Sequence, residues 1–218
     1  MAYKASAVIT MAQRFLVDTE DNAYSVGTSD DTNDMLNYLN EACRRFAAET
    51  HCCQGIVTVS VTAQNITFAT ILAELGSSIV EQVLYITKVM PKTGTNYTPL
   101  PKAPISEMKA LLASTVTTPT RYSVFAESIY FDTHPDTVLA FNATVSCSYV
   151  PKDLTSTDEY ILIPDEWVQA IVKYIVFCCR IADRDAGLAN GAYQEFEAIK
   201  QAAAAVNISQ IEKIPGVA

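Results

Sequence analysis

The residues that could perform acid–base, nucleophilic or metal chemistry are few in this chain and poorly spaced for it. The only histidines are His51 and His134, and both are expected in connecting segments, one just after a helix and one in a proline-containing turn. Cys52 follows His51 directly, but neighbours in sequence seldom reach the geometry that activates a thiolate. The glycines stand singly, so the sequence shows no phosphate-binding loop. We therefore predict a protein that is not an enzyme and binds no cofactor.

The six cysteines form neither a metal-binding nor a disulfide pattern. Two adjacent pairs occur, Cys52 with Cys53 and Cys178 with Cys179, and adjacent cysteines rarely bridge each other. A zinc site needs a second pair of Cys or His ligands at suitable spacing, which the segment around His51 lacks. We expect no metal, and free thiols that pack as small apolar side chains.

Composition separates the remaining classes of function. The chain has 218 residues, of which 50% are hydrophobic and 18% charged, and its formal net charge is −9. Proteins that grip nucleic acid concentrate Lys and Arg on one face, whereas the only adjacent basic pair here is Arg44 with Arg45. No apolar run approaches the roughly 20 residues that cross a bilayer. We therefore expect neither specific nucleic-acid binding nor a membrane location, and we assign the apolar excess to contacts between subunits.

The spacing of the apolar residues predicts an α+β fold. Periods of three and four mark helices in the first and last thirds of the chain, and a two-residue period marks strands between them. We expect helices at residues 4–16, 32–50, 104–114, 164–185 and 188–206. We expect strands at residues 56–62, 66–68, 79–90, 122–125, 128–132 and 138–150. The prediction is a helical bundle with a central antiparallel sheet or sandwich that contains one inserted short helix.

These elements suggest two domains and a tail. The helical domain is discontinuous and comprises residues 1–54 and 160–206, while residues 55–159 form the β-rich domain. The last segment, residues 207–218, is too short to fold alone. We therefore predict that this tail docks on another protein.

The helix that begins at Pro164 is more apolar than its own domain requires. One stripe runs through Trp167, Ile171 and Ile181, and a second through Val172 and Ile175. A helix that packs once against its domain needs one apolar face, so we expect the second stripe to meet another copy or another protein. The resulting interface candidates are Trp167, Ile171, Val172, Ile175, Val176, Phe196, Ile199, Ile208, Ile211 and Ile214.

Two groups of aromatic residues have alternative interpretations. Trp167 is the only tryptophan, and it fits either a core anchor, which we favour, or an interface anchor. The tyrosines of the middle region could form a platform for a carbohydrate or peptide, although their spacing suits half-exposed sheet residues better. These tyrosines are Tyr85, Tyr97, Tyr122, Tyr130, Tyr149 and Tyr160.

Several segments stand out by their content and their order along the chain. The sequence Asn-Glu-Ala-Cys-Arg-Arg-Phe-Ala-Ala-Glu-Thr occupies residues 40–50, just before the first strand. Thr-Pro-Thr-Arg-Tyr at 118–122 precedes a strand pair, and Tyr-Val-Pro-Lys-Asp-Leu-Thr at 149–155 precedes Leu-Ile-Pro-Asp at 162–165. In this order the segments resemble the head-to-tail adaptor (connector) proteins of tailed bacteriophages, and the resemblance covers about residues 5–205.

The resemblance implies a structural protein of the virion neck, made in the host cytoplasm. Such a protein would form a homo-oligomeric ring, a dodecamer if it matches a twelve-fold portal, and would bind the portal protein and tail or nozzle proteins. Double-stranded DNA would pass through the ring without specific binding. A different neck ring, such as a tail terminator or stopper, remains an alternative, as does a soluble carbohydrate- or peptide-binding module.

Overall fold

The computed structural model describes residues 2–16, 29–93, 96–111, 118–133 and 141–212. The chain divides into two compact units. The first, which is helical, contains residues 1–53 and 150–208, and the second, which is rich in strands, contains residues 54–149 and 209–218. The α+β class predicted from the sequence is confirmed, while the predicted domain boundaries stay a prediction.

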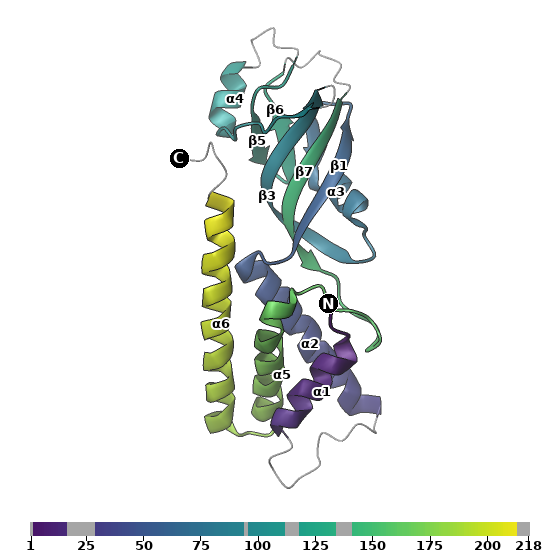
Figure 1. The fold of residues 1–218 in the computed structure, drawn as a ribbon, viewed down its shortest axis with the longest axis vertical. Helices are drawn as coiled ribbons and strands as arrows, with labels where there is room; N and C mark the ends of the chain where they lie inside the picture. The colour runs from purple at the N-terminus through teal and green to yellow at the C-terminus, as the bar shows by residue number, and fades with distance from the viewer. Residues whose placement is uncertain (1, 17–28, 94–95, 112–117, 134–140, 213–218) are drawn as a thin grey trace. The chain divides into compact units, whose positions relative to one another are not determined.

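The first unit is built around α5 (Val168–Ala182), which a 3₁₀ turn at Asp165–Trp167 introduces. Both α1 (Ala5–Leu16) and α2 (Ser29–Thr50) pack against α5. The remaining helix, α6 (Ala186–Glu212), lies along α5 on the side away from α1 (Figure 1). Apolar residues three and four apart give α1 one apolar face, and its buried residues are Ala5, Val8, Ile9, Ala12 and Leu16.

Hydrogen bonds tie the segment between residues 152 and 164 to both of the first two helices. The Asn40 side chain donates to the Leu154 carbonyl and accepts from the Leu154 N–H, each at 2.9 Å. The N–H of Ala5, at the start of α1, donates to the Glu159 carbonyl at 2.9 Å. Because Asn40 is 7% exposed, these bonds also satisfy an amide that would be costly to bury unpaired.

The turn between α5 and α6 differs from the predicted one. The sequence suggests that Gly187 ends the first helix of the pair, but Gly187 lies inside α6. Arg184 supplies the left-handed backbone at φ 62° instead. The Asp185 carboxylate then caps α6 by accepting from the Leu188 N–H at 3.2 Å, which satisfies one of the unpaired donors at a helix start.

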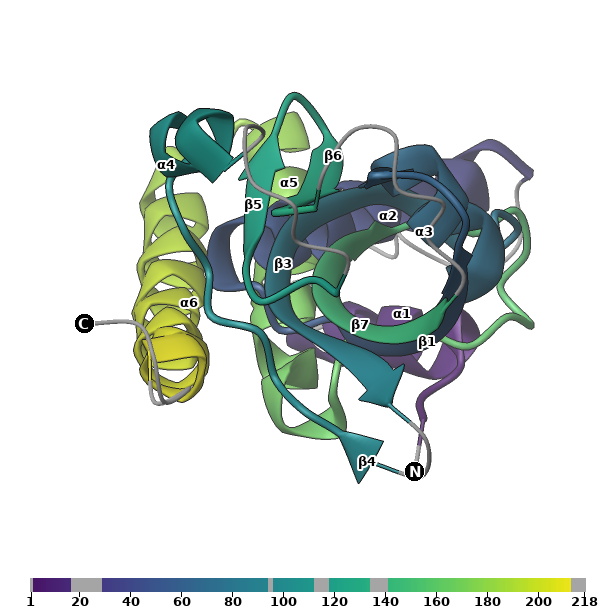
Figure 2. The ribbon, with the colours of Figure 1, turned by 90° about the horizontal axis from the view of Figure 1, so that it is seen from above.

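The second unit contains two antiparallel sheets. One has the strand order β1-β7-β3-β4, and the other has the order β2-β6-β5. Figure 2 shows that β1, β7 and β3 curl strongly around one another. The strands of the first sheet are β1 (Gln54–Val61), β7 (Phe141–Pro151), β3 (Val80–Thr93) and β4 (Asn96–Tyr97). Those of the second are β2 (Asn65–Thr67), β6 (Ser128–Phe131) and β5 (Tyr122–Phe125).

Every second residue over much of the length of β1 and β7 is buried, and these residues form the centre of the core of the second unit. Val57 lies opposite Val145, and Val59 lies opposite Ala143, and all four side chains are buried. The intervening pairs, such as Thr58 with Thr144, are polar and point to the other face. The second sheet adds its own buried residues to this core, among them Ile66, Tyr122, Ile129 and Phe131.

The β5–β6 hairpin was predicted almost to the residue. Its two-residue turn places Ala126 and Glu127 at φ 45° and 55°, which is the conformation that matches the right-handed twist of hairpin strands. The Glu127 carbonyl accepts from the Phe68 N–H at 2.8 Å. That bond fixes the hairpin against the start of α3 (Phe68–Leu75).

Other predicted boundaries need correction. Helix α3 was missed altogether, although Thr67 caps its start by accepting from the Thr70 N–H. Strand β3 continues through Pro91, where the predicted strand ended. Helix α4 (Ile105–Leu111) lies within the inserted helix expected at 104–114. Helix α6 reaches Glu212 rather than residue 206, so the start of the predicted tail is helical.

Candidate functional site

Helix α5, which the sequence marks as an interface, is enclosed by its own unit. The side chains of Ile171, Val172 and Ile175 are 0% exposed, and Val176 is 7% exposed. Because α1 and α2 both pack against α5, the two apolar stripes have partners within the chain, except at Ile181 near the end of the helix, which is 50% exposed. The argument that the second stripe must face a neighbouring subunit therefore fails for this helix.

An aromatic cluster covers the remaining side of α5 and attaches α6 to it. The ring centroids of Tyr174 and Phe196 lie 5.0 Å apart, and those of Phe177 and Tyr193 lie 4.8 Å apart. Phe46 of α2 joins at 6.2 Å from Phe196. Phe196 is 0% exposed, so this predicted interface candidate is a core residue.

A second set of side chains, which we call the α6 clamp, holds α6 to α2 by charge. It consists of Arg45, Glu49, Tyr193, Glu197 and Lys200. The Arg45 guanidinium lies 5.6 Å from the centre of the Tyr193 ring and donates to the Tyr193 hydroxyl at 2.8 Å. It also donates to Glu49 at 3.0 Å. Arginine combines ring stacking with forked hydrogen bonding better than lysine does, so this residue suits its position.

Lys200 closes the α6 clamp from the other helix. Its ammonium group pairs with Glu49 and, at 2.7 Å, with Glu197. Burial lowers the pKa of Lys200, but hydrogen bonds to Glu197 and Glu49 outweigh burial and leave the pKa above its ordinary value. The hydrogen bond from Lys200 likewise holds the pKa of Glu197 below its ordinary value. Lys200 is 8% exposed, and a charge this buried needs such partners.

The opposite face of α6 has a different character. The helical period places six exposed positions together there, and we call them the outer α6 face: Gly187, Gly191, Gln194, Ala198, Gln201 and Ala205. Not one of these side chains is charged, whereas helix faces turned to water normally carry charged residues. A Cβ added at Gly191 would meet nothing within 4 Å. The glycine is therefore not required by packing within the unit, although it costs a helix roughly 1 kcal/mol relative to alanine.

The remaining interface candidates lie in varied surroundings. Trp167 is half-buried, with its ring 6.4 Å from that of Phe46, so both the core and the interface interpretation stay predictions. Ile199 is half-buried on α6. Ile208 and Ile211 fall within α6, in a part where side chains are not described, and Ile214 lies outside the described residues. For these three residues the interface role stays a prediction.

The tyrosines considered as a binding platform do not form one surface. Tyr122 is 3% exposed and belongs to the core of the second unit, and its burial raises the pKa to about 12. Tyr160 belongs to the first unit, and the other five tyrosines belong to the second. Tyr97 is 46% exposed whereas Tyr122 is covered, so the platform interpretation loses support.

The candidate chemical groups occupy structural positions. His51 has φ 54°, and its N–H donates to the Ala47 carbonyl at 2.9 Å, which ends α2. Burial raises the pKa of Cys147 to about 11, which disfavours the reactive thiolate. Among the described residues, His, Cys, Asp and Glu nowhere gather in threes that could hold a metal ion. Nor does any described helix combine the length and apolar character that crossing a membrane requires.

Comparison with known proteins identifies a family whose model matches this chain. The family model described as SU10 adaptor protein matches residues 3–212. The match spans both units and all of the described helices and strands. No curated protein matches the chain.

Proposed function

This chain belongs to the SU10 adaptor protein family, and we propose that it forms a closed ring between the portal and the tail of a bacteriophage. A phage adaptor is a structural protein and not an enzyme. The ring would leave a central channel for double-stranded DNA, and its place would be the neck of the virion. The family match supports an adaptor in preference to a tail terminator or stopper.

The outer α6 face carries the proposal for how the ring is built. Ring closure needs two different surfaces on one subunit, joined head to tail by rotation. Small side chains such as Gly191 and Ala198 allow a neighbouring helix to approach to the short end of the 8–10 Å range of helix packing. Since α5 is enclosed, α6 is the helix of the first unit that supports such a contact best.

The net charge of −9 is compatible with DNA passing through the ring. A surface that does not concentrate Lys and Arg gains little from releasing counterions, so DNA is not held on it. The docking tail stays part of the proposal as a contact with the portal. Its residues beyond Glu212 lie outside the described chain.

A single charge on the outer α6 face tests the ring. Ala198→Arg places a cation at an exposed position of α6, where a surface substitution should change the free energy of unfolding by less than about 0.5 kcal/mol. We expect the wild-type chain to bind a purified portal ring as a complete ring in mass photometry, and Ala198→Arg to remain monomeric with an unchanged melting temperature.

Gln169→Arg is the matched control, because Gln169 is exposed on α5 of the same unit. It should assemble on the portal as the wild type does. If the wild type never associates with a portal, the proposed function is wrong. If Ala198→Arg assembles normally, the adaptor role stands and the interface lies elsewhere.

A further inference from the structure

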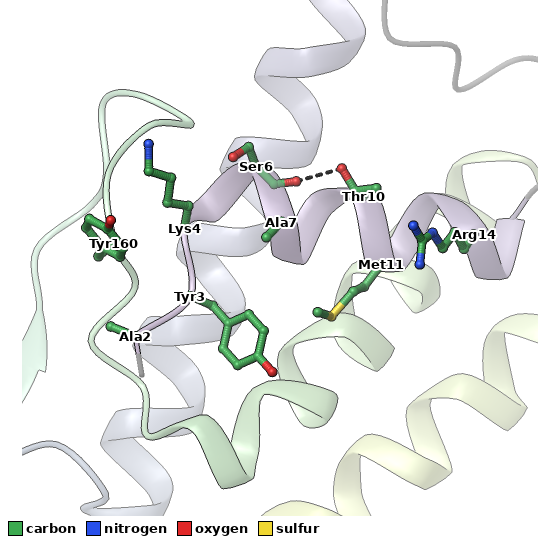
Figure 3. A pocket seen from close by; sticks show the side chains of 9 residues that line it. All are labelled: Ala2, Tyr3, Lys4, Ser6, Ala7, Thr10, Met11, Arg14 and Tyr160. Carbon is green, nitrogen blue, oxygen red and sulfur yellow. Dashed lines mark hydrogen bonds between the residues drawn. The ribbon is translucent and has the colours of Figure 1, made fainter.

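A pocket of about 490 Å³ lies along α1 and the residues just before it. Lys4 and Tyr160 stand at one end of the pocket and Arg14 at the other, and between them lie Tyr3, Ala7 and Met11 together with the hydroxyl side chains of Ser6 and Thr10 (Figure 3). All of these residues belong to the first unit. The pocket is thus a feature of one unit and needs no second subunit to form.

The wall of the pocket is held in place by the backbone. The Ile161 N–H donates to the Tyr3 carbonyl at 2.9 Å, and Lys4 pairs with Tyr160 in an isolated antiparallel bridge. On the opposite face of α1, Val8 and Ala12 are 0% exposed. Because one face of α1 is packed and its start is tied down, the pocket is formed before any partner binds.

Two cations mark the ends of this pocket in an otherwise acidic chain. Lys4 and Arg14 are both exposed and ten residues apart, which corresponds to about 15 Å along a helix. The Lys4 ammonium lies 5.9 Å from the centre of the Tyr160 ring, an exposed ring with room for further contacts.

The acidic residues near Lys4 bind its ammonium group only weakly, so a carboxylate of another molecule can replace them. Asp158 lies 3.7 Å from the Lys4 ammonium, and its side chain is 87% exposed, so this pair contributes little stability. Glu159 is already engaged, because its carboxylate accepts from the backbone N–H groups of Thr155 and Ser156 at 3.0 and 2.9 Å. Asp158 is therefore the local competitor for Lys4.

We propose that this pocket binds an acidic peptide segment of a partner protein. Two carboxylates would pair with Lys4 and Arg14, and an aliphatic side chain between them would contact Ala7 and Met11. An extended chain covers about 15 Å in four or five residues, which sets the spacing of the two acids. Nucleic acid fits less well, because its phosphates could pair with Lys4 and Arg14 but it has no aliphatic group to contact Ala7 and Met11.

A labelled peptide tests the pocket without any phage partner. The probe is a fluorescein-labelled peptide in which two glutamates flank the tripeptide Ala-Leu-Ala, and binding to the full chain is followed by fluorescence anisotropy. We expect Arg14→Ala and Lys4→Ala each to weaken binding about fivefold, the upper end for an exposed ion pair. Asp158→Asn should strengthen it about twofold, since the competitor for Lys4 is removed. Arg184→Ala removes an exposed cation elsewhere in the unit and should change nothing.

Three outcomes would overturn the proposal. The peptide fails to bind, or it binds equally well to Arg14→Ala and Arg184→Ala, or a labelled DNA duplex binds the pocket and displaces it. Replacing the leucine of the probe by serine isolates the apolar part of the pocket and should also weaken binding. Because the measurement uses monomeric protein, it is independent of ring formation, and either proposal can fail alone.

Discussion

Helices α5 and α6 are both poor in charge on a broad face, yet their surroundings are opposite. α5 carries two apolar stripes, and Ile171, Val172 and Ile175 are fully covered by the same unit. α6 is attached along one side and leaves the outer α6 face in solvent. Apolar content therefore shows how much surface must be covered, but not what covers it. The better sign of an interface here is an exposed helix face without charge.

The way the two helices are attached differs as well. α5 is held by close packing of aliphatic side chains, which is costly to disturb because cavities collapse only partly. α6 is held by rings and ion pairs at a few positions, with carboxylates that remain partly exposed. Glu49 and Glu197 have side chains 42% and 28% exposed. Substitutions should consequently cost more in α5 than in α6.

The strongest test of this comparison removes a side chain from α5. Ile175→Ala empties a site that is 0% exposed, and we expect it to lower the free energy of unfolding by about 2–5 kcal/mol. Ile181→Ala, on the same helix but 50% exposed, should lower it by less than about 0.5 kcal/mol. Urea unfolding followed by circular dichroism measures both.

Equal stability of the two variants would show that α5 is not enclosed in solution. In that case the original interpretation of Ile175 as a residue between subunits would return. A loss confined to Ile175→Ala would instead confirm it as a core residue of the monomer.

A smaller effect is expected from the α6 clamp. Lys200→Met keeps most of the length of the side chain but removes its ion pairs with Glu49 and Glu197. Hydrogen bonds to charged groups contribute about 1.5–3 kcal/mol when buried, and partial exposure of the two carboxylates reduces this to about 1–2 kcal/mol. The same urea measurement applies, and amide hydrogen exchange should show faster exchange in α6 but not in α5.

Lys173→Met is a useful control, because Lys173 of α5 also pairs with an α6 carboxylate, Glu195, at 2.7 Å. That carboxylate is 58% exposed, so its loss should cost less than about 1 kcal/mol. If Lys173→Met lowered the free energy of unfolding as much as Lys200→Met, the α6 clamp would contribute no more to the attachment of α6 than an exposed ion pair does.

The sequence predicted local structure well where the period of the residues was clear. The β5–β6 hairpin followed from two alternating runs around Ala126 and Glu127, and α2 followed from apolar residues three and four apart. Helix α3 was missed because its eight residues form an apolar run too short to distinguish a helix from a strand. The cap at Thr67 and the stop at Gly76, which has φ 99°, were the signals that could have revealed it.

The candidate site was harder to predict, because the residues that meet there are far apart in the sequence. Arg45 and Tyr193 are 148 residues apart in sequence, and nothing in either local pattern indicates that they touch. The apolar stripes of α5 were read correctly as stripes, but their partners in α1 and α2 come from distant segments. The outer α6 face could have been found from its spacing, since Gly187, Gly191 and Ala198 recur at helical intervals.

The smallest expected effect concerns pH, and it depends on the ion pairs of the α6 clamp. The hydrogen bond from Lys200 depresses the pKa of Glu197 below its ordinary value of 4.5. A depressed carboxyl pKa adds stability above the unfolded pKa, and this stability is lost as the pH falls through the folded pKa. The pKa of Lys200 is raised from 10.5, so its contribution is complete below that value and is lost as the pH rises further. The α6 clamp should therefore be strongest between these two limits.

Glu197→Gln isolates the acid side of that window. At about pH 7 the variant should be less stable than the wild type by up to about 1 kcal/mol, because Glu197 is only partly buried. At about pH 3.5, which is below the ordinary carboxyl pKa of 4.5, the difference should shrink, because the unfolded wild-type chain binds a proton there more readily than the folded one. Urea unfolding of both proteins at the two pH values gives this difference directly. The effect of low pH on all other titrating groups is the same in both proteins and cancels in the difference. A difference that stayed constant with pH would mean that Glu197 acts through shape and not through charge. The attachment of α6 would then resemble that of α5 more than the structure suggests.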